Sequence, residues 1–252
     1  MKTDDYKKFA DLSFDDFRRM AGDDSLSQYE RIGFPDSYRE GKEPAIFEDI
    51  TAKLPALAAG RGKVVLDVGP GCSGLPVMLA ELCRRQGHTL LLVDSEEMLA
   101  RLPDEPFVRK FPAYYPRCEE LFAEYAGRVD VLLCYSVLHY VFAESNLWDF
   151  LDASLSLLAD GGQMLLGDVP NVSKRRRFFS SAAGVRFHRE FTKTETTPEV
   201  AFNRVERGQI DDAVVLSLVA RARAEGCDAY VVPQREDLPM ANRREDILIR
   251  KP

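Results

Sequence analysis

A glycine-rich loop follows an apolar, β-branched run, and among the residue patterns of this sequence it has the clearest chemical use. The stretch VVLDVGPGCSGL spans residues 64–75 and places Gly69, Gly71 and Gly74 in G-x-G-x-x-G spacing. Glycines at such positions permit a tight turn and let a ligand approach the backbone closely. The pattern therefore predicts a nucleotide-binding loop between a strand and a helix.

Two carboxylates bear on which ligand this loop would hold. Asp94 ends the next predicted strand, where a carboxylate accepts hydrogen bonds from ribose hydroxyls. Asp67 stands just before Gly69 and would repel the pyrophosphate of a dinucleotide, and Pro70 lacks the N–H group that a phosphate would use. An adenosyl ligand with an ammonium and a sulfonium would be attracted instead. The sequence thus favours S-adenosylmethionine. An NAD-dependent oxidoreductase and a non-catalytic S-adenosylmethionine-binding module are the alternatives.

The rest of the chain alternates between predicted strands and helices from Lys63 onward. Strand patterns occur at 63–68, 89–94, 106–110, 129–134, 162–168, 227–232 and 246–250. Helical patterns occur at 75–86, 95–101, 118–126, 145–158 and 211–225. Several of the strands are apolar at nearly every position, which is typical of strands covered on both faces. We therefore expect an α/β fold around a largely parallel sheet.

Four segments, in this order, resemble the motifs of class I S-adenosylmethionine-dependent methyltransferases. They are LDVGPGCSG, LLLVDSEEML, VDVLLCYSVLHYV and LLADGGQMLLGDV. The resemblance covers about residues 60–168 and implies a Rossmann-like, seven-stranded sheet in the order 3-2-1-4-5-7-6, with the seventh strand antiparallel. It also implies a set of cofactor-binding residues: Asp67, Gly69, Pro70, Gly71, Ser73, Asp94, Ser95, Met98, Tyr135 and Ser136.

The resemblance leaves the residues that hold adenine open. Many relatives place an acidic residue after the third strand, but here the sequence is FVRKFPAYYPR, with no carboxylate. Backbone groups, Phe111 or Tyr114 are the candidates for that contact.

The flanking regions divide the chain further. Residues 1–60 are expected to form an N-terminal helical cover or lid, in which Tyr29, Tyr38 and Arg39 approach the ligands, and residues 61–252 form the methyltransferase domain. An insertion at 170–210 follows the fifth strand and contains nine Lys or Arg against four Glu, a net charge of +5. Insertions at this end of a sheet often bind ligands. Substrate or oligomer contacts are the two roles we consider for this one.

Two residues are candidates for proton abstraction from the methyl acceptor. His139 follows the fourth strand and Asp168 ends the fifth, so both are expected at the acceptor side of the crevice. An alcohol acceptor would need such a base, whereas an amine or a thiolate would mainly need alignment. His139 is also compatible with a purely structural role. The chemistry requires no metal, and we expect none.

The acceptor itself is suggested by a fainter resemblance. GFPDSYREGKEPAIFEDITAKL and GDVPNVSKRRRFF are similar to segments of bacterial methyltransferases associated with surface-sugar biosynthesis. The implied acceptor is a sugar-like small molecule, phosphorylated or nucleotide-linked, that is methylated on a hydroxyl or an amine. Arg175 and Arg176 would bind its phosphates, because an arginine fork matches phosphate oxygens.

Composition excludes other classes of protein. A net charge of −7 disfavours a nucleic-acid partner, since phosphate neutralisation requires a basic face. The sequence contains no apolar run of about 18 residues, and its charged N-terminus lacks the apolar core of a signal peptide. The five cysteines are scattered, which is typical of free thiols. We therefore expect a cytoplasmic protein without a membrane partner. A homodimer is compatible with the sequence.

Overall fold

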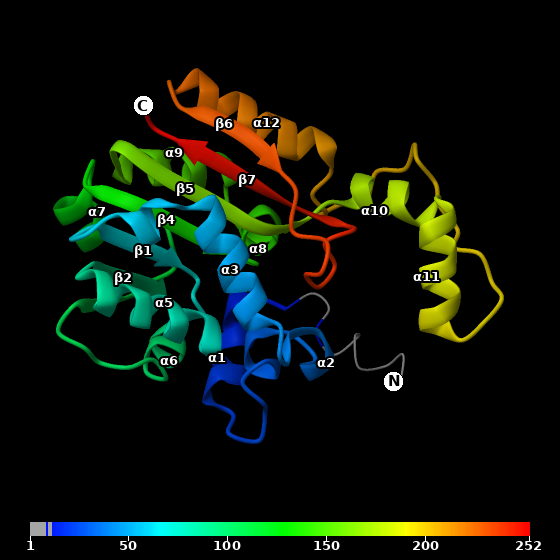
Figure 1. The fold of residues 1–252 in the computed structure, drawn as a ribbon, viewed down its shortest axis with the longest axis horizontal. Coiled ribbons are helices and arrows are strands. Elements are labelled where there is room, and N and C mark those ends of the chain that lie inside the picture. The colour runs from blue at the N-terminus through cyan, green and yellow to red at the C-terminus, as the bar shows by residue number, and fades with distance from the viewer. Residues whose placement is uncertain (1–8, 10–11) are drawn as a thin grey trace.

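Seven strands form one sheet in the part of the chain that the computed structural model describes, residue 9 and residues 12–252. Their order is β3-β2-β1-β4-β5-β7-β6, which confirms the predicted topology (Figure 1). β7 runs antiparallel to β5 and β6, and the other neighbouring pairs are parallel. The strands are β1 (Val64–Val68), β2 (Thr89–Asp94), β3 (Val108–Pro112), β4 (Val129–Tyr135), β5 (Leu158–Pro170), β6 (Asp228–Val232) and β7 (Arg244–Arg250).

Helices cover both faces of this sheet, as the apolar strands predicted. One face carries α3 (Glu43–Lys53), α4 (Ala56–Ala59), α5 (Gly74–Gln86) and α6 (Glu96–Leu99). The opposite face carries α7 (Glu119–Tyr125), α9 (Leu147–Leu157) and α12 (Asp212–Ala224). Fully buried side chains such as Ile50 and Leu79 fill the first layer, and Phe150 and Leu218 fill the second.

The first 60 residues do not form one unit. α3 and α4 belong to the core, because Ile46, Ile50 and Leu57 are packed against the sheet. α1 (Phe14–Gly22), η2 (Glu30–Ile32) and α2 (Asp36–Arg39) instead supply residues to the pocket described below. Within the described residues, the part before α3 therefore contributes to the pocket, and the part from α3 onward contributes to the core.

The helix expected at 145–158 is α9. The preceding helix α8 (Leu138–Glu144) was not among the predicted segments, and it ends before Asn146, which caps α9 by accepting from the Trp148 and Asp149 amides. The insertion contains α10 (Val172–Phe179) and α11 (Ala182–Thr192), which project from the body of the molecule (Figure 1). No helix within the described residues is long and apolar enough to cross a membrane.

Candidate cofactor pocket

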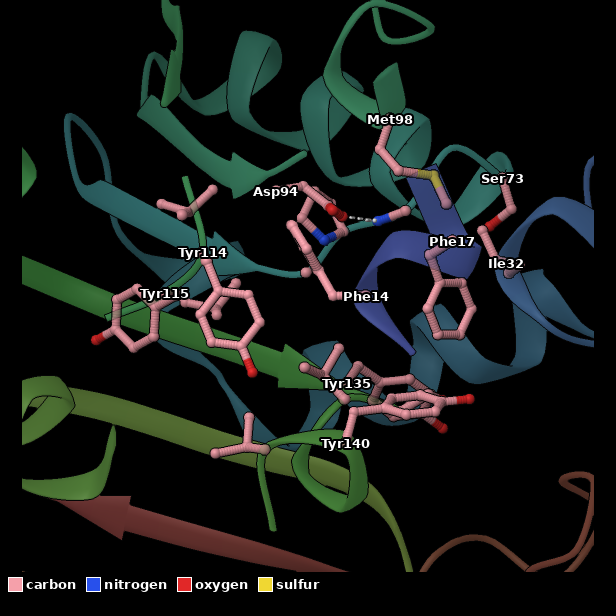
Figure 2. Close-up of a pocket in the computed structure, with 18 of the residues that line it drawn as sticks. Phe14, Phe17, Ile32, Ser73, Asp94, Met98, Tyr114, Tyr115, Tyr135 and Tyr140 are labelled. Carbon is pink, nitrogen blue, oxygen red and sulfur yellow. Dashed lines mark hydrogen bonds between the residues drawn. The ribbon is translucent and has the colours of Figure 1, made fainter. Parts of the chain in front are cut away.

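A pocket of about 990 Å³, its open mouth included, lies at the carboxyl ends of β1, β2 and β4 (Figure 2). Ligands of open α/β sheets bind at this edge. Eight of the ten predicted cofactor-binding residues line the pocket: Gly69, Pro70, Gly71, Ser73, Asp94, Met98, Tyr135 and Ser136. Most of the other lining residues are aromatic or aliphatic, as is usual for pockets that bind small molecules.

The glycine loop forms one wall and requires its glycines. Gly69 and Gly71 have positive φ angles of 70° and 64°. A Cβ atom on Gly69 would lie 2.6 Å from Val137 Cγ2, and one on Gly71 would lie 2.7 Å from Ile32 Cγ2. The loop therefore packs too closely against its neighbours for any side chain at these two positions.

The first two glycine amides of this loop are bonded within the protein. Gly69 N donates to Val93 O at 2.8 Å, and Gly71 N donates to Asp94 Oδ2 at 3.0 Å. Pro70, between them, has no N–H group. Three successive positions thus offer no free amide hydrogen to a phosphate.

The start of α5 is also occupied, by a carboxylate. Glu43, at the first turn of α3, is 4% exposed, and its Oε2 lies 2.4 Å from where a Cβ atom on Gly74 would be. Its Oε1 is buried and has no hydrogen-bond partner among the described residues. A helix N-terminus attracts anions, and here the protein places its own carboxylate against it.

Asp94 lies where the ribose contact was predicted. It also accepts a hydrogen bond from Ser95 N at 2.7 Å, so the end of β2 and the glycine loop are fixed by one carboxylate. Burial raises the pKa of Asp94 to about 6, and its two backbone hydrogen bonds limit that rise. Ser95 itself lies outside the pocket wall and caps α6 by accepting from Met98 N at 3.2 Å.

Asp67 lies behind the loop and not in the pocket wall. It is 4% exposed and shares the face of β1 that carries Val65, toward α3 and α5. Burial, and then the nearby Asp94 carboxylate, raise the pKa of Asp67 to about 8. Its predicted repulsion of a pyrophosphate depended on a negative charge, which the side chain largely lacks at neutral pH when no cation is near.

Asp168 lies in a buried ion network beside the pocket. Arg244 donates to Asp168 Oδ2 at 2.8 Å, and Arg39 Nη2 lies 3.4 Å from the same oxygen. The Ser136 hydroxyl donates to this oxygen as well and accepts from Arg39 at 2.6 Å. Protein donors therefore fill the accepting capacity of Oδ2. Asp168 lines a smaller hollow together with Tyr38 and does not line the main pocket.

His139 also lies outside the wall of the main pocket. Its Nδ1 is buried without a hydrogen-bond partner among the described residues, and its ring packs on Tyr140 with 3.9 Å between centroids. Burial, followed by the nearby Arg244 charge, lowers the pKa of His139 to about 3. The neutral imidazole fits the structural role that the sequence left open.

The wall opposite the glycine loop consists of aromatic residues that the sequence analysis did not assign. Phe14 and Phe17, on α1, make edge-to-face contacts with Tyr114 and Tyr140, each with 4.9 Å between centroids. A capping box at Ser13 starts α1 and directs both rings to one side. The Phe-x-x-Phe spacing after that serine was the available signal.

The other predicted site residues lie in three different places. Arg39 lines the main pocket, and Tyr114, a candidate for the adenine contact, does too. Phe111 is a buried core residue. Arg175 and Arg176 line a separate hollow on the α10–α11 insertion, where both pair with Glu206 at 2.7 Å.

Comparison with known proteins identifies the fold. No protein-family model matches the sequence. No curated protein matches it at a significant level either. Among solved structures, the plantazolicin methyltransferase BpumL, determined with a substrate analogue and SAH, is similar at a TM-score of 0.56 and 12% identity, over 94% of this chain and 97% of that one.

Two further solved structures agree with this result. A protein in complex with the Haloferax volcanii Trm112 methyltransferase activator gives a TM-score of 0.56 at 13% identity, over 93% of this chain and 96% of that chain. The CurJ carbon methyltransferase gives 0.54 at 16% identity, over 89% of this chain and 61% of the other. The chain therefore has the Rossmann-like fold found in S-adenosylmethionine-dependent methyltransferases.

Proposed function

We propose that this protein transfers a methyl group from S-adenosylmethionine to a small molecule. The observation that carries the proposal is the hydrogen bonding of the glycine loop. The pocket keeps a carboxylate for a ribose, Asp94, but the loop amides at Gly69 and Gly71 are bonded within the protein. With Glu43 against the start of α5, such a site suits an adenosyl cation and not a pyrophosphate.

Asp67 does not carry the discrimination between the two ligands. Burial raises the pKa of this carboxyl to about 8, so its negative charge is weak at neutral pH, although a cationic ligand would favour the ionised form. Discrimination against NAD therefore rests on the bonded amides of Gly69 and Gly71, on Pro70, and on the Glu43 carboxylate beside the start of α5. These features oppose the alternative of an NAD-dependent oxidoreductase, because a pyrophosphate would meet fewer donors and a like charge.

The residues present fit the proposed cofactor. Asp94 would accept from ribose hydroxyls, Gly69 and Gly71 would allow close approach of the methionine part, and Met98 would pack on the adenine. When bound, the cofactor supplies a methyl group that is already activated by the sulfonium. The protein would then mainly align the acceptor and exclude water, as the aromatic wall over the pocket would do.

A nucleotide-linked sugar is the narrower acceptor that the sequence suggested, and we do not extend the proposal to it. Arg175 and Arg176 line a hollow that shares no residue with the main pocket, and Glu206 already pairs with both. Most residues of the pocket wall are aromatic or aliphatic.

Binding measurements separate the candidate functions. We expect S-adenosylhomocysteine to bind in isothermal titration calorimetry and to stabilise the fold by about 2.7 kcal/mol at 100 times its Kd. NADH should produce neither heat nor stabilisation. Binding of NADH without binding of either adenosyl compound would refute the proposal. Adenosyl binding without methyl release from labelled S-adenosylmethionine, over a broad acceptor screen, would indicate the non-catalytic module.

A further inference from the structure

Four aromatic rings line the part of the pocket formed by α1, α8 and the loop after β3, which we call the aromatic half. Phe14 and Phe17 come from α1, Tyr140 from α8, and Tyr114 from the loop after β3. Figure 2 shows Asp94, Met98 and Ser73 along one side of the pocket and Tyr140 on the other, with the two phenylalanines between them. The two edge-to-face pairs fix the rings, so the box is formed before any ligand enters.

One carboxylate accompanies these rings. The described lining residues include two acidic side chains, Asp94 and Glu144. Asp94 belongs to the cofactor half and is bonded to two backbone amides. Glu144, at the end of α8, is exposed and accepts from Phe14 N at 3.4 Å. Among the described lining residues, Glu144 is therefore the acidic side chain that lies beside the aromatic rings.

We infer that the methyl acceptor is a cationic amine, held as an ammonium by these four rings and Glu144. The inference rests on the proposed methyl transfer and names its substrate class. Aromatic faces attract ammonium groups through the ring quadrupole, and a nearby carboxylate adds a direct charge interaction. A neutral apolar acceptor would use the rings but would gain nothing from Glu144.

The chemistry of an amine acceptor agrees with the surroundings. An ammonium has no free electron pair, so the acceptor first loses one proton, which passes to water beside the exposed Glu144. The nitrogen pair then forms the N–C bond while the C–S pair stays on sulfur, which leaves a neutral thioether and a methylated ammonium. No buried base is needed, which is consistent with the positions of His139 and Asp168 outside the pocket wall.

A pair of isosteric probes tests the inference on protein saturated with S-adenosylhomocysteine. Choline and 3,3-dimethyl-1-butanol have the same shape and differ in one positive charge. We expect calorimetry to give choline the lower Kd by about tenfold, within the range of cation–π energies. Glu144→Gln keeps an acceptor for Phe14 N, and it should weaken choline about fivefold and leave the neutral probe unchanged. Glu190→Gln, on the exposed surface of α11, is the control and should leave the Kd values of both probes unchanged.

Each outcome decides one question. Equal binding of the two probes, binding of neither, or an unchanged choline Kd in Glu144→Gln would overturn the inference. If Glu144→Gln instead weakened S-adenosylmethionine relative to S-adenosylhomocysteine, the aromatic box would belong to the sulfonium, and the inference would again fail. Failure of S-adenosylhomocysteine to bind would refute the proposed function itself, a result that the first titration gives separately.

Discussion

At the residue scale, Gly69 shows how close packing shapes the cofactor loop. Gly69→Ala places a Cβ atom at a positive φ and 2.6 Å from Val137 Cγ2. The left-handed conformation alone costs a non-glycine residue about 1–2 kcal/mol, and the overlap adds to that. We expect urea denaturation to show a loss of at least about 2 kcal/mol in unfolding free energy. Calorimetry should show the loss of S-adenosylhomocysteine binding.

Gly127 provides a matched control for this substitution. It has a similar φ of 67°, but a Cβ atom there would meet nothing within 4 Å. Gly127→Ala should therefore lower the free energy of unfolding by only the cost of the left-handed backbone, about 1–2 kcal/mol. It should leave the affinity for S-adenosylhomocysteine unchanged. Equal effects of the two variants on affinity would show that the approach of Val137 is unimportant.

Asp67 makes stability depend on pH. Its folded pKa of about 8 lies above the ordinary value of 3.8 because the side chain is buried. The contribution of Asp67 to the free energy of unfolding is therefore fully present below pH 3.8. It decreases as the pH rises and is lost above about pH 8. Asp67→Asn removes this titration. We expect urea denaturation to show that the unfolding free energy of the variant rises relative to that of the wild type between pH 5 and pH 8. The rise should be at most about 1.4 kcal/mol per pH unit.

Asp160→Asn is the control for this pH series. Asp160 has a side chain that is 93% exposed, so water solvates it in both the folded and the unfolded state. The difference between this variant and the wild type should stay constant with pH. A difference for Asp67→Asn that is equally flat would contradict the burial argument.

At the element scale, we propose that α1 acts as a cover of the pocket, since Phe14 and Phe17 line it. It is held by the two aromatic pairs and by Arg18, whose Nη2 lies 2.7 Å from Glu97 Oε1 on α6. Phe17→Ala removes the contact with Tyr140, which is worth about 1 kcal/mol beyond burial. We expect S-adenosylhomocysteine to dissociate about fivefold to tenfold faster in surface plasmon resonance, because the cover opens more readily.

Phe202→Ala serves as the comparison for Phe17→Ala. Phe202 lies in the insertion, is 57% exposed, and is remote from the pocket wall. Its removal should leave the dissociation rate unchanged. If Phe17→Ala also left it unchanged, α1 would be a static layer and not a cover.

The Asp168 network joins elements that are distant in the sequence. Asp168, at the end of β5, pairs with Arg244 of β7 and Arg39 of α2, and its amide donates to Asp246 Oδ1 at 2.8 Å. Asp168→Asn would leave buried guanidinium groups with one charge partner fewer. We expect the unfolding free energy to fall by about 3 kcal/mol in urea denaturation. Asp160→Asn, on the same strand, should have little effect.

The alternative for Asp168 is a role as general base. A variant that kept the wild-type stability but lost turnover would support that role and contradict the structural one. Ser136 and Asp168 both adopt positive φ angles, 62° and 58°, which is rare for non-glycine residues. The network holds these strained strand ends in place, so a loss of stability is the expected first effect.

Local patterns predicted the alternation of strands and helices and most of the cofactor half, because a glycine loop and a carboxylate at a strand end are encoded within a few residues. Gly71 and Asp94 were found in this way. The sheet order came from the resemblance to class I methyltransferases. Side chains alternate between the two faces along β1. Asp67 therefore lies on the same face of the strand as Val65, while Leu66 and Val68 lie on the opposite face. The alternation of the strand is thus the sequence signal for the burial of Asp67.

Contacts between distant segments could not be predicted from such patterns. Glu43 meets Gly74 only after α3 packs beside α5, and Arg39 reaches Asp168 across 129 positions of the chain. The aromatic half of the pocket likewise combines α1 with α8 and the loop after β3. Residue types at these positions suggest core packing, and only the tertiary fold shows that they form a site.

At the scale of the whole molecule, the insertion differs from the rest in charge and packing. Residues 170–210 carry +5 in a chain of −7, so the remaining residues carry −12. Within α10 and α11, only Val172 and Gly184 are buried. Phe178, Phe179 and Phe187 contact one another but are only half-buried. The insertion therefore contributes little to the core.

The two ends of this insertion meet, which makes it removable. Val172 N donates to Ile210 O at 2.9 Å, and both residues are buried. Replacing residues 175–207 by a short glycine linker should leave the sheet and the pocket intact, because loop closure at this point is already provided by the native contact. We expect the shortened chain to unfold cooperatively and to bind S-adenosylhomocysteine with a Kd within twofold of the full chain in calorimetry. A large loss of affinity would show that the insertion completes the cofactor site and would contradict its independence from the core.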